Sequence, residues 1–199
     1  YFTLYNDNIL PAICGRVCPQ EKQCEGSCIL GIKSDSVSIG ALERFLGDYG
    51  LEHNLQSEEL IVDNGIKVAI VGSGPAGLSN AASMRRLGYD VTIFEALHDF
   101  GGVLKYGIPD FRLPTNIVDK EILRLKDLGI KFEKNVLIGK TITIDQLKND
   151  YHFKAIFLGS GAGLPSALNI PGENSSGVYY ANEFLTRVNL MKSRDFPHN

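Results

Sequence analysis

The pattern of apolar and polar positions changes near residue 60 of this 199-residue chain. From residue 66 onward, short apolar runs of strand length alternate with longer segments of helical period. That order is typical of a parallel sheet covered by helices. We interpret three runs as buried strands: Lys67–Val71, Val91–Phe94 and Ala155–Leu158. The pattern predicts an α/β fold over residues 66–199, with a Rossmann-like βαβ unit at its start.

Helical segments complete the expected organisation. Ala76–Leu87 follows the first strand and ends at Gly88, and a glycine is a common helix stop,. Before residue 60, Ser38–Tyr49 places its apolar residues on one helical face,. We therefore predict a small α-helical domain over residues 1–60. A polar, turn-prone linker around Asp63–Gly65 separates it from the α/β domain,.

Bulk composition excludes several classes of function. The net charge is -3, which gives no electrostatic reason to expect a nucleic-acid or acidic-lipid partner,. No apolar run approaches the roughly 20 residues that cross a bilayer,. We therefore expect a cytoplasmic protein with no nucleic-acid and no membrane partner. The chain begins at Tyr1, and we expect it to be part of a longer protein.

A glycine-rich turn directly after the first strand is the main functional motif. It comprises Gly72, Ser73, Gly74, Pro75, Ala76 and Gly77. In such a motif the first glycine permits a tight turn, the second lets a pyrophosphate approach the backbone, and the third lets the helix pack against the strand. The helix N-terminus then offers free N–H groups to the phosphates. The turn predicts a dinucleotide site; the alternative is a glycine turn without a ligand.

An acidic residue stands where this site needs one. Glu95 follows Gly77 by eighteen residues, at the end of the second strand. A carboxylate about 20 residues beyond the glycines binds ribose hydroxyls in such folds. FAD and NAD both fit this unit. The second glycine pair, Gly101-Gly102, suggests that more backbone comes close to a longer ligand.

The stretch from Lys67 to Pro114 resembles the FAD domain shared by glutamate synthase small subunits, dihydropyrimidine dehydrogenase and adrenodoxin-reductase-like enzymes. Its Gly-Gly-x-Leu and Ile-Pro-x-Phe-Arg-Leu-Pro segments carry the resemblance. By this resemblance the turn from Gly72 to Ala76 holds the FAD pyrophosphate, and Glu95 holds the ribose.

The resemblance also implies cofactor contacts beyond the turn, from Gly102, Val103, Arg112, Ile138 and Gly161. Val103 and Arg112 match flavin-contacting positions, and Ile138 matches an adenine-side position. Gly161 ends a Gly-Ser-Gly turn where the family usually has Ala-Thr-Gly, and its small residues still permit close approach. Without the flanking motif, Arg112 reads equally well as a surface arginine in an ion pair.

All four cysteines lie in one short segment, at Cys14, Cys18, Cys24 and Cys28. Thiolates are soft ligands that suit zinc or iron–sulfur clusters. The gaps of three, five and three residues differ from the two-residue gaps of a zinc ribbon,. A closed four-cysteine zinc site nevertheless remains an alternative, whereas disulfides do not suit the expected cytosolic setting.

This segment is similar to the N-terminal iron–sulfur module of the same family, which holds two [4Fe–4S] clusters. The resemblance assigns Cys18, Cys24 and Glu43 to one cluster and Cys28 to the other, with Cys14 not required. Glu43 alone would read as a solvated helix carboxylate. The family's upstream cysteine group is not in this sequence. The ligand set is therefore incomplete, and we expect the chain as given to hold no intact cluster or only a labile one.

The resemblance implies electron transfer from NADPH, or NADH, through FAD and the clusters to a partner such as the glutamate synthase large subunit. The family's second glycine motif, which binds NADPH, is also not in this sequence. We find no catalytic acid–base or nucleophile set and expect no catalytic residue. Alternatives are the equivalent module of dihydropyrimidine dehydrogenase or a transhydrogenase, and a non-catalytic nucleotide-binding module with structural zinc. A plain NAD-dependent dehydrogenase leaves the second glycine pair unexplained.

Overall fold

The computed structural model describes residues 1–55 and 60–197. The N-terminal part is helical, with α1 (Phe2–Asp7), α2 (Pro11–Val17), the short turns η1 (Gln20–Lys22) and η2 (Ile29–Ile32), and α3 (Ile39–Glu52). The second part alternates strands and helices, in the order β1 (Lys67–Val71), α4 (Pro75–Arg86), β2 (Asp90–Glu95), α5 (Val103–Tyr106), α6 (Thr115–Asp127), β3 (Lys131–Lys134), α7 (Ile144–Asn149) and β4 (Ala155–Leu158). The C-terminal segment adds α8 (Ala181–Leu185), η3 (Thr186–Leu190) and η4 (Ser193–Asp195).

The strands form one parallel sheet in the order β3-β2-β1-β4. Val68 of β1 pairs with Val91 of β2 on one side and with Ala155 of β4 on the other. This arrangement confirms the predicted α/β fold. β2 and β3 follow β1 on one side of the sheet, whereas β4 pairs with β1 on the opposite side. The carboxyl ends of β1 and β4 therefore form a switch point, where such folds bind ligands.

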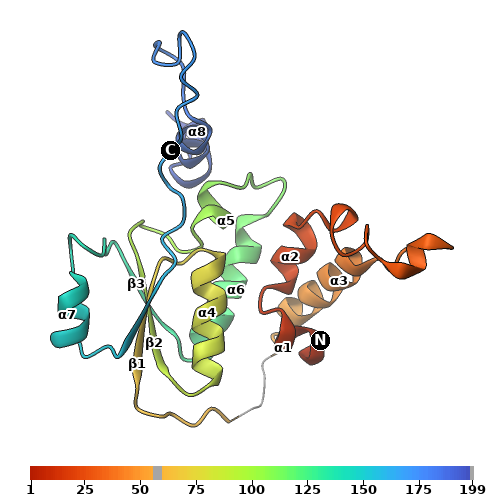
Figure 1. Cartoon of the computed structure of the whole chain (residues 1–199), viewed down its shortest axis with the longest axis horizontal. Coiled ribbons are helices and arrows are strands. Elements are labelled where there is room, and N and C mark those ends of the chain that lie inside the picture. The colour runs from red at the N-terminus through yellow and green to blue at the C-terminus, as the bar shows by residue number, and fades with distance from the viewer. Residues whose placement is uncertain (56–59, 198–199) are drawn as a thin grey trace.

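Helices cover both faces of the sheet (Figure 1). In this view α4 and α6 lie between the sheet and the N-terminal helices, and α7 lies on the other side. One core cluster contains Tyr5 and Ile13 of the N-terminal part together with Ile70, Leu78 and Leu125 of the α/β part. The two parts therefore share a continuous apolar core. The domain bounds at residues 60 and 66 remain predictions.

Most expected elements appear with small shifts. β4 has the predicted bounds, β2 is one residue longer at each end, and the predicted helix 38–49 is α3, which begins one residue later and runs to Glu52. Helix α5 is not evident from the sequence pattern. Its four residues are too few for a helical period to show, and it follows the glycine pair Gly101-Gly102. Since the pair has positive φ at both positions, it sets the direction in which α5 begins,.

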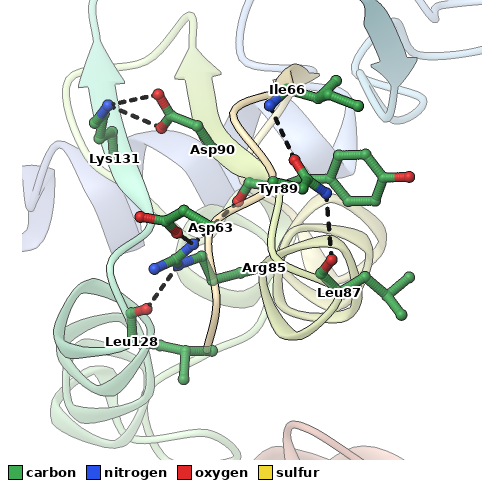
Figure 2. Close-up of polar contacts among 9 residues, drawn as sticks. Asp63, Ile66, Arg85, Leu87, Tyr89, Asp90, Leu128 and Lys131 are labelled. Carbon is green, nitrogen blue, oxygen red and sulfur yellow. Dashed lines mark hydrogen bonds and ion pairs between the residues drawn. The ribbon is translucent and has the colours of Figure 1, made fainter. Parts of the chain in front are cut away.

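The linker is held against the C-terminal end of α4 (Figure 2). The Arg85 guanidinium donates to the Leu128 carbonyl oxygen at 3.0 Å and also pairs with Asp63. Asn64 donates its backbone N–H to the Gly88 carbonyl oxygen at 2.9 Å. A Cβ on Gly88 would lie 2.2 Å from the Val62 carbonyl oxygen, so the stop of α4 is also the point where the linker crosses it.

The two cysteine-region helices pack backbone against backbone. A Cβ on Gly15 of α2 would lie 2.4 Å from the backbone nitrogen of Arg44, and one on Gly47 of α3 would lie 2.3 Å from the Ala12 nitrogen. Arg16 and Asp48 then join the helices by two contacts of 2.7 and 2.9 Å. The close approach leaves α2 little freedom to shift against α3.

A buried ion pair within α6 lies against the N-terminal part. Glu121 is fully buried and pairs with Arg124, which also donates to the Ile9 carbonyl oxygen at 2.7 Å. Burial raises the pKa of Glu121 to about 7; the Arg124 guanidinium and the Ala12 amide oppose this shift, and Asp48 adds to it. The folded protein thus keeps a proton on Glu121 at pH values where the unfolded chain does not.

This shift predicts a pH-dependent contribution of Glu121 to stability. Because the folded pKa of about 7 lies above the ordinary 4.5, stability is full below 4.5 and falls as the pH rises toward 7,. Relative to Glu121→Gln, the unfolding free energy of the wild type should therefore fall by on the order of 1–3 kcal/mol between pH 5 and pH 8. Urea unfolding of both proteins at constant ionic strength measures this, and parallel pH curves would contradict it.

Candidate functional site

The turn after β1 is held by close backbone contacts. Gly72 has φ +99°, and a Cβ there would lie 2.3 Å from the carbonyl oxygen of Gly159, which follows β4. A Cβ on Gly77 would lie 1.9 Å from the Gly72 carbonyl oxygen. Both glycines are thus required by the fold itself, because β4 and α4 approach the turn more closely than a side chain allows.

Gly74 differs from these two glycines. A Cβ built on it meets no atom within 4 Å, and its φ of -71° and ψ of 179° suit any residue. It lies at the N-cap of α4, and no side chain caps that helix end. Free amides and a positive helix end facing open space suit an anion. The turn therefore has a shape that suits a diphosphate, and close approach of a diphosphate at Gly74 remains a prediction.

The second glycine pair reaches the same turn. A Cβ on Gly102, whose φ is +52°, would lie 2.9 Å from the Gly74 Cα. The Gly101 N–H donates to the Ser73 hydroxyl at 3.0 Å. The spatial contact explains why the chain needs two glycine motifs: both supply bare backbone to one place.

Glu95 reaches the turn but is already engaged there. The side chain is 6% exposed. One carboxylate oxygen accepts the Ser73 N–H at 2.9 Å and the Ser73 hydroxyl, and the other accepts the Leu97 N–H at 2.9 Å. An ionised carboxylate has about four lone-pair sites, so three bonds leave capacity for one more donor. The ribose role of Glu95 remains a prediction that this geometry permits.

Ser73 has a role that the sequence did not reveal. It is fully buried and connects the Glu95 carboxylate to the Gly101 amide. The sequence motif assigns Ser73 only to the residues that hold the pyrophosphate. In the sequence, the only sign of this role is a small hydroxyl-bearing residue between two glycines. The fold is needed to show that Ser73 joins Glu95 to Gly101.

The remaining predicted contacts lie at different distances from the turn. Val103 begins α5 directly after Gly102 and is 40% exposed. Gly161 has φ +72° and open space around its Cβ position, two residues after Gly159. Arg112 is exposed on the loop between α5 and α6. Ile138 is half-buried against the small apolar cluster that includes Leu147 of α7. The structure thus groups Gly102, Val103 and Gly161 with the turn's neighbours, and it places Arg112 on an exposed loop and Ile138 against a separate apolar cluster.

The cysteines are distributed around α2 and the turns that follow it. Cys14 lies in α2, Cys18 caps it, and Cys28 precedes η2. Burial raises the pKa of the Cys14 thiol to about 11, and Cys18 and Glu43 add to this shift. The packing of α2 on α3 therefore places these three groups in one neighbourhood.

Within residues 1–55 and 60–197, no three Cys, His, Asp or Glu side chains converge in an arrangement that would hold a metal ion. The Glu43 carboxylate instead accepts a hydrogen bond from Asn8. The backbone amides of Val37 and Leu30 lower the pKa of the Cys28 thiol, which favours the thiolate that metals bind,. The donor chemistry fits a cluster, whereas the ligand set of Cys18, Cys24, Cys28 and Glu43 remains a prediction.

Two polar contacts that sequence reasoning missed fix the cysteine segment. The Gln20 amide donates to the Cys14 carbonyl oxygen at 2.9 Å, and the Gly40 N–H donates to Glu25 at 2.8 Å. A Cβ on Gly40 would also lie 2.5 Å from Gln20. These contacts attach the segment between Cys18 and Cys28 to both helices.

Comparison with known proteins places the chain. Residues 66–198, two thirds of its length, match the family described as pyridine nucleotide-disulphide oxidoreductase. The chain belongs to this family. Residues 1–55 match the family described as dihydropyrimidine dehydrogenase domain II, 4Fe-4S cluster. The predicted resemblance is therefore confirmed, and the cysteine segment matches an iron–sulfur domain family.

Several relatives have the same two-part sequence. The glutamate synthase [NADPH] small chain of Bacillus subtilis is 44% identical over 184 residues, which cover 92% of this chain and 36% of that protein. The NAD-dependent dihydropyrimidine dehydrogenase subunit PreT of Escherichia coli K12 is 39% identical over 188 residues, covering 94% and 44%. The structure of Mycobacterium tuberculosis FprA in complex with NADPH is 27% identical, with a TM-score of 0.54, and covers 61% of this chain and 28% of that one.

The chain spans less than half of the length of these curated relatives, 36% of one and 44% of the other. The cofactor classes that we expected, namely FAD, [4Fe–4S] clusters and NADPH, agree with the two family matches and the NADPH-bound neighbour. In the described part of the chain, no helix has the length and apolar character needed to span a membrane.

Two glycines of the turn make a matched pair for testing the site. Gly74→Ala should leave the unfolding free energy within about 0.5 kcal/mol of wild type, because its Cβ meets nothing. The same methyl should block the diphosphate and weaken FAD binding about tenfold or more. Gly77→Ala should instead lower the unfolding free energy by about 1–3 kcal/mol, because its Cβ meets the Gly72 carbonyl oxygen.

Urea unfolding and FAD titration by flavin fluorescence measure the two effects separately. If Gly74→Ala binds FAD as wild type does, the turn is not the diphosphate site. If both variants lose the same stability, the distinction between the two glycines is wrong.

Proposed function

We propose that this chain is the FAD- and iron–sulfur-binding part of an NAD(P)H-dependent oxidoreductase of the glutamate synthase small-subunit type. One observation supports this most strongly: a Cβ on Gly74 would meet no atom within 4 Å, whereas a Cβ on Gly72, Gly77 or Gly102 would collide with neighbouring backbone. Packing of the fold therefore does not require a glycine at position 74, whereas bare backbone at this point suits a diphosphate.

The residues of the turn would bind and orient FAD. Amides at the start of α4 would hold the diphosphate, and the remaining lone pair of Glu95 would accept a ribose hydroxyl. Ser73 keeps that carboxylate in place through its own N–H and hydroxyl. Gly161 would give the cofactor room beside β4. When bound, FAD supplies a centre that accepts a hydride and releases single electrons; the protein contributes placement and tuning.

Three further residues would contact the two ends of FAD. Val103, the first residue of α5, and Arg112, on the loop after α5, would approach the flavin. Ile138 would lie on the adenine side, near the apolar cluster with Leu147. We assign none of them an acid or base role, since this chemistry requires none from the protein.

The cysteine segment would hold part of the ligand set of two [4Fe–4S] clusters. Cys18, Cys24 and Glu43 would serve one cluster and Cys28 the other. The lowered pKa of Cys28 supports a thiolate there, and the packing of α2 on α3 supports a shared neighbourhood for Cys18 and Glu43. Ligands from outside this chain would complete both sets.

The acceptor of the electrons lies beyond this chain. The small-chain relatives support an electron-accepting large subunit as the partner, and the NADPH in the names of those relatives supports NADPH as the donor. A cytoplasmic location is consistent with these relations. The PreT relative supports a dihydropyrimidine-dehydrogenase-type assembly as the second candidate.

An absorption spectrum with cofactor analysis tests the proposal. The full-length protein, purified under anaerobic conditions, should show two flavin bands on a broad iron–sulfur shoulder, release one FAD per polypeptide on denaturation, and contain iron with sulfide. Because the proposed contacts to FAD lie within this chain, the flavin should return when the apoprotein is mixed with FAD. A colourless protein with one zinc per chain would contradict both parts of the proposal.

A further inference from the structure

One aromatic ring lies at the junction of the two parts of the chain. Tyr5 of α1 is 3% exposed. The Arg86 guanidinium carbon lies 4.4 Å from the centre of its ring, and that of Arg124 lies 4.0 Å from it. Arg86 is the last residue of α4, and Arg124 belongs to α6. Two cations from two helices thus contact the same ring.

Both arginines also hold the backbone of the N-terminal part. Arg86 donates to the Tyr5 carbonyl oxygen at 3.0 Å and to that of Asn6 at 3.4 Å. Arg124 donates to the Ile9 carbonyl oxygen at 2.7 Å, just before α2 begins. The contacts therefore fix the chain on the entry side of α2, which ends at the predicted ligand Cys18.

The same two helices also support the proposed FAD site at other points along their length. Helix α4 begins at the glycine turn, with Gly74 as its N-cap. Helix α6 meets the second glycine pair, because a Cβ on Gly101 would lie 3.0 Å from the Val118 side chain. Asp119 of α6 pairs with the buried Lys105 of α5. Each helix thus contacts the FAD site at one point and the N-terminal part at another.

The buried ion pair at the junction is incompletely hydrogen-bonded, so a contribution to stability does not by itself explain it. Apart from its ion pair with Arg124 and the nearby Ala12 amide, Glu121 meets no hydrogen-bond donor among the described residues, and the Arg124 Nε has no acceptor there. Apolar replacements of buried ion pairs are often neutral or stabilising. In some proteins, however, a buried set of polar and charged groups defines one relative geometry where an apolar contact tolerates several.

We propose that Arg86, Glu121 and Arg124 are positioning residues that hold the cysteine-bearing helix α2 at one fixed separation from the FAD site. This inference rests on the proposed function, in which electrons cross between those two places. Electron transfer slows steeply as the gap between centres widens, so a junction that fixes the gap controls the rate. None of the three residues needs to touch either cofactor.

Two variants and a control test the proposal. Glu121→Leu combined with Arg124→Met replaces the ion pair by apolar groups, and Arg86→Met removes the second cation from Tyr5. The control is Lys131→Met, which breaks the exposed pair with Asp90 at the far ends of β3 and β2. Urea unfolding should show the double variant to be as stable as wild type or more stable.

The first measurement is made on the chain without cofactors. Amide hydrogen exchange in residues 5–17 should rise about tenfold or more in both variants, while exchange in β1 and β2 stays as in wild type. The Lys131→Met control should match wild type throughout. Unchanged exchange in residues 5–17 would overturn the proposal, because Arg86, Glu121 and Arg124 would then not hold α2 in place.

The second measurement is made on the full-length protein with FAD and clusters bound. Stopped-flow mixing with NADPH should reduce the flavin at the wild-type rate in both variants. The electron paramagnetic resonance signal of reduced clusters should then appear about tenfold more slowly or worse. An unchanged rate of cluster reduction, or an equal loss in both steps, would overturn the positioning role. A wild-type protein without flavin would refute the proposed function, and hydrogen exchange would still decide whether the junction is rigid.

Discussion

The close approach of bare backbone at the end of β1 is the constraint on which the rest of the structure depends. Gly72 lets the turn pass against Gly159 after β4, and Gly77 lets α4 begin against the turn itself. These contacts fix the direction of α4, whose far end reaches the N-terminal helices through Arg86. A side chain at either glycine would move α4, and with it both the turn and the junction.

Much of this arrangement could be predicted from the sequence, because it rests on residues whose lack of a side chain is visible in the motif. Glycines at fixed spacing between an apolar run and a helical period leave few alternatives, and the strands β1 and β4 were predicted to the residue. The Ser73 contacts with Glu95 and Gly101 could not be predicted. They join residues more than twenty positions apart, and a serine in a glycine turn has many other partners available.

The cysteine segment shows a different limit. Thiolate chemistry is evident from the residue type, so the sequence indicated soft-metal binding and the family match agrees. The positions of Cys14 and Cys18 depend on the glycine contacts between α2 and α3, at Gly15 and Gly47, which carry no motif. Spacing along the chain therefore identified the chemistry of the segment but not the geometry of the ligands, and the ligand assignments rest on resemblance.

The junction follows a further physical rule. An apolar core already joins the two parts of the chain, so stability alone does not require a fully buried Glu121 whose pKa burial raises to about 7. Apolar side chains pack in several similar ways, whereas a guanidinium held between a ring and a carbonyl oxygen has few acceptable positions. A protein that must keep two redox centres at one separation gains more from that restriction than from added stability. Arg86 and Arg124 lie on α4 and α6, the two helices that also border the proposed FAD site, and this placement agrees with the requirement.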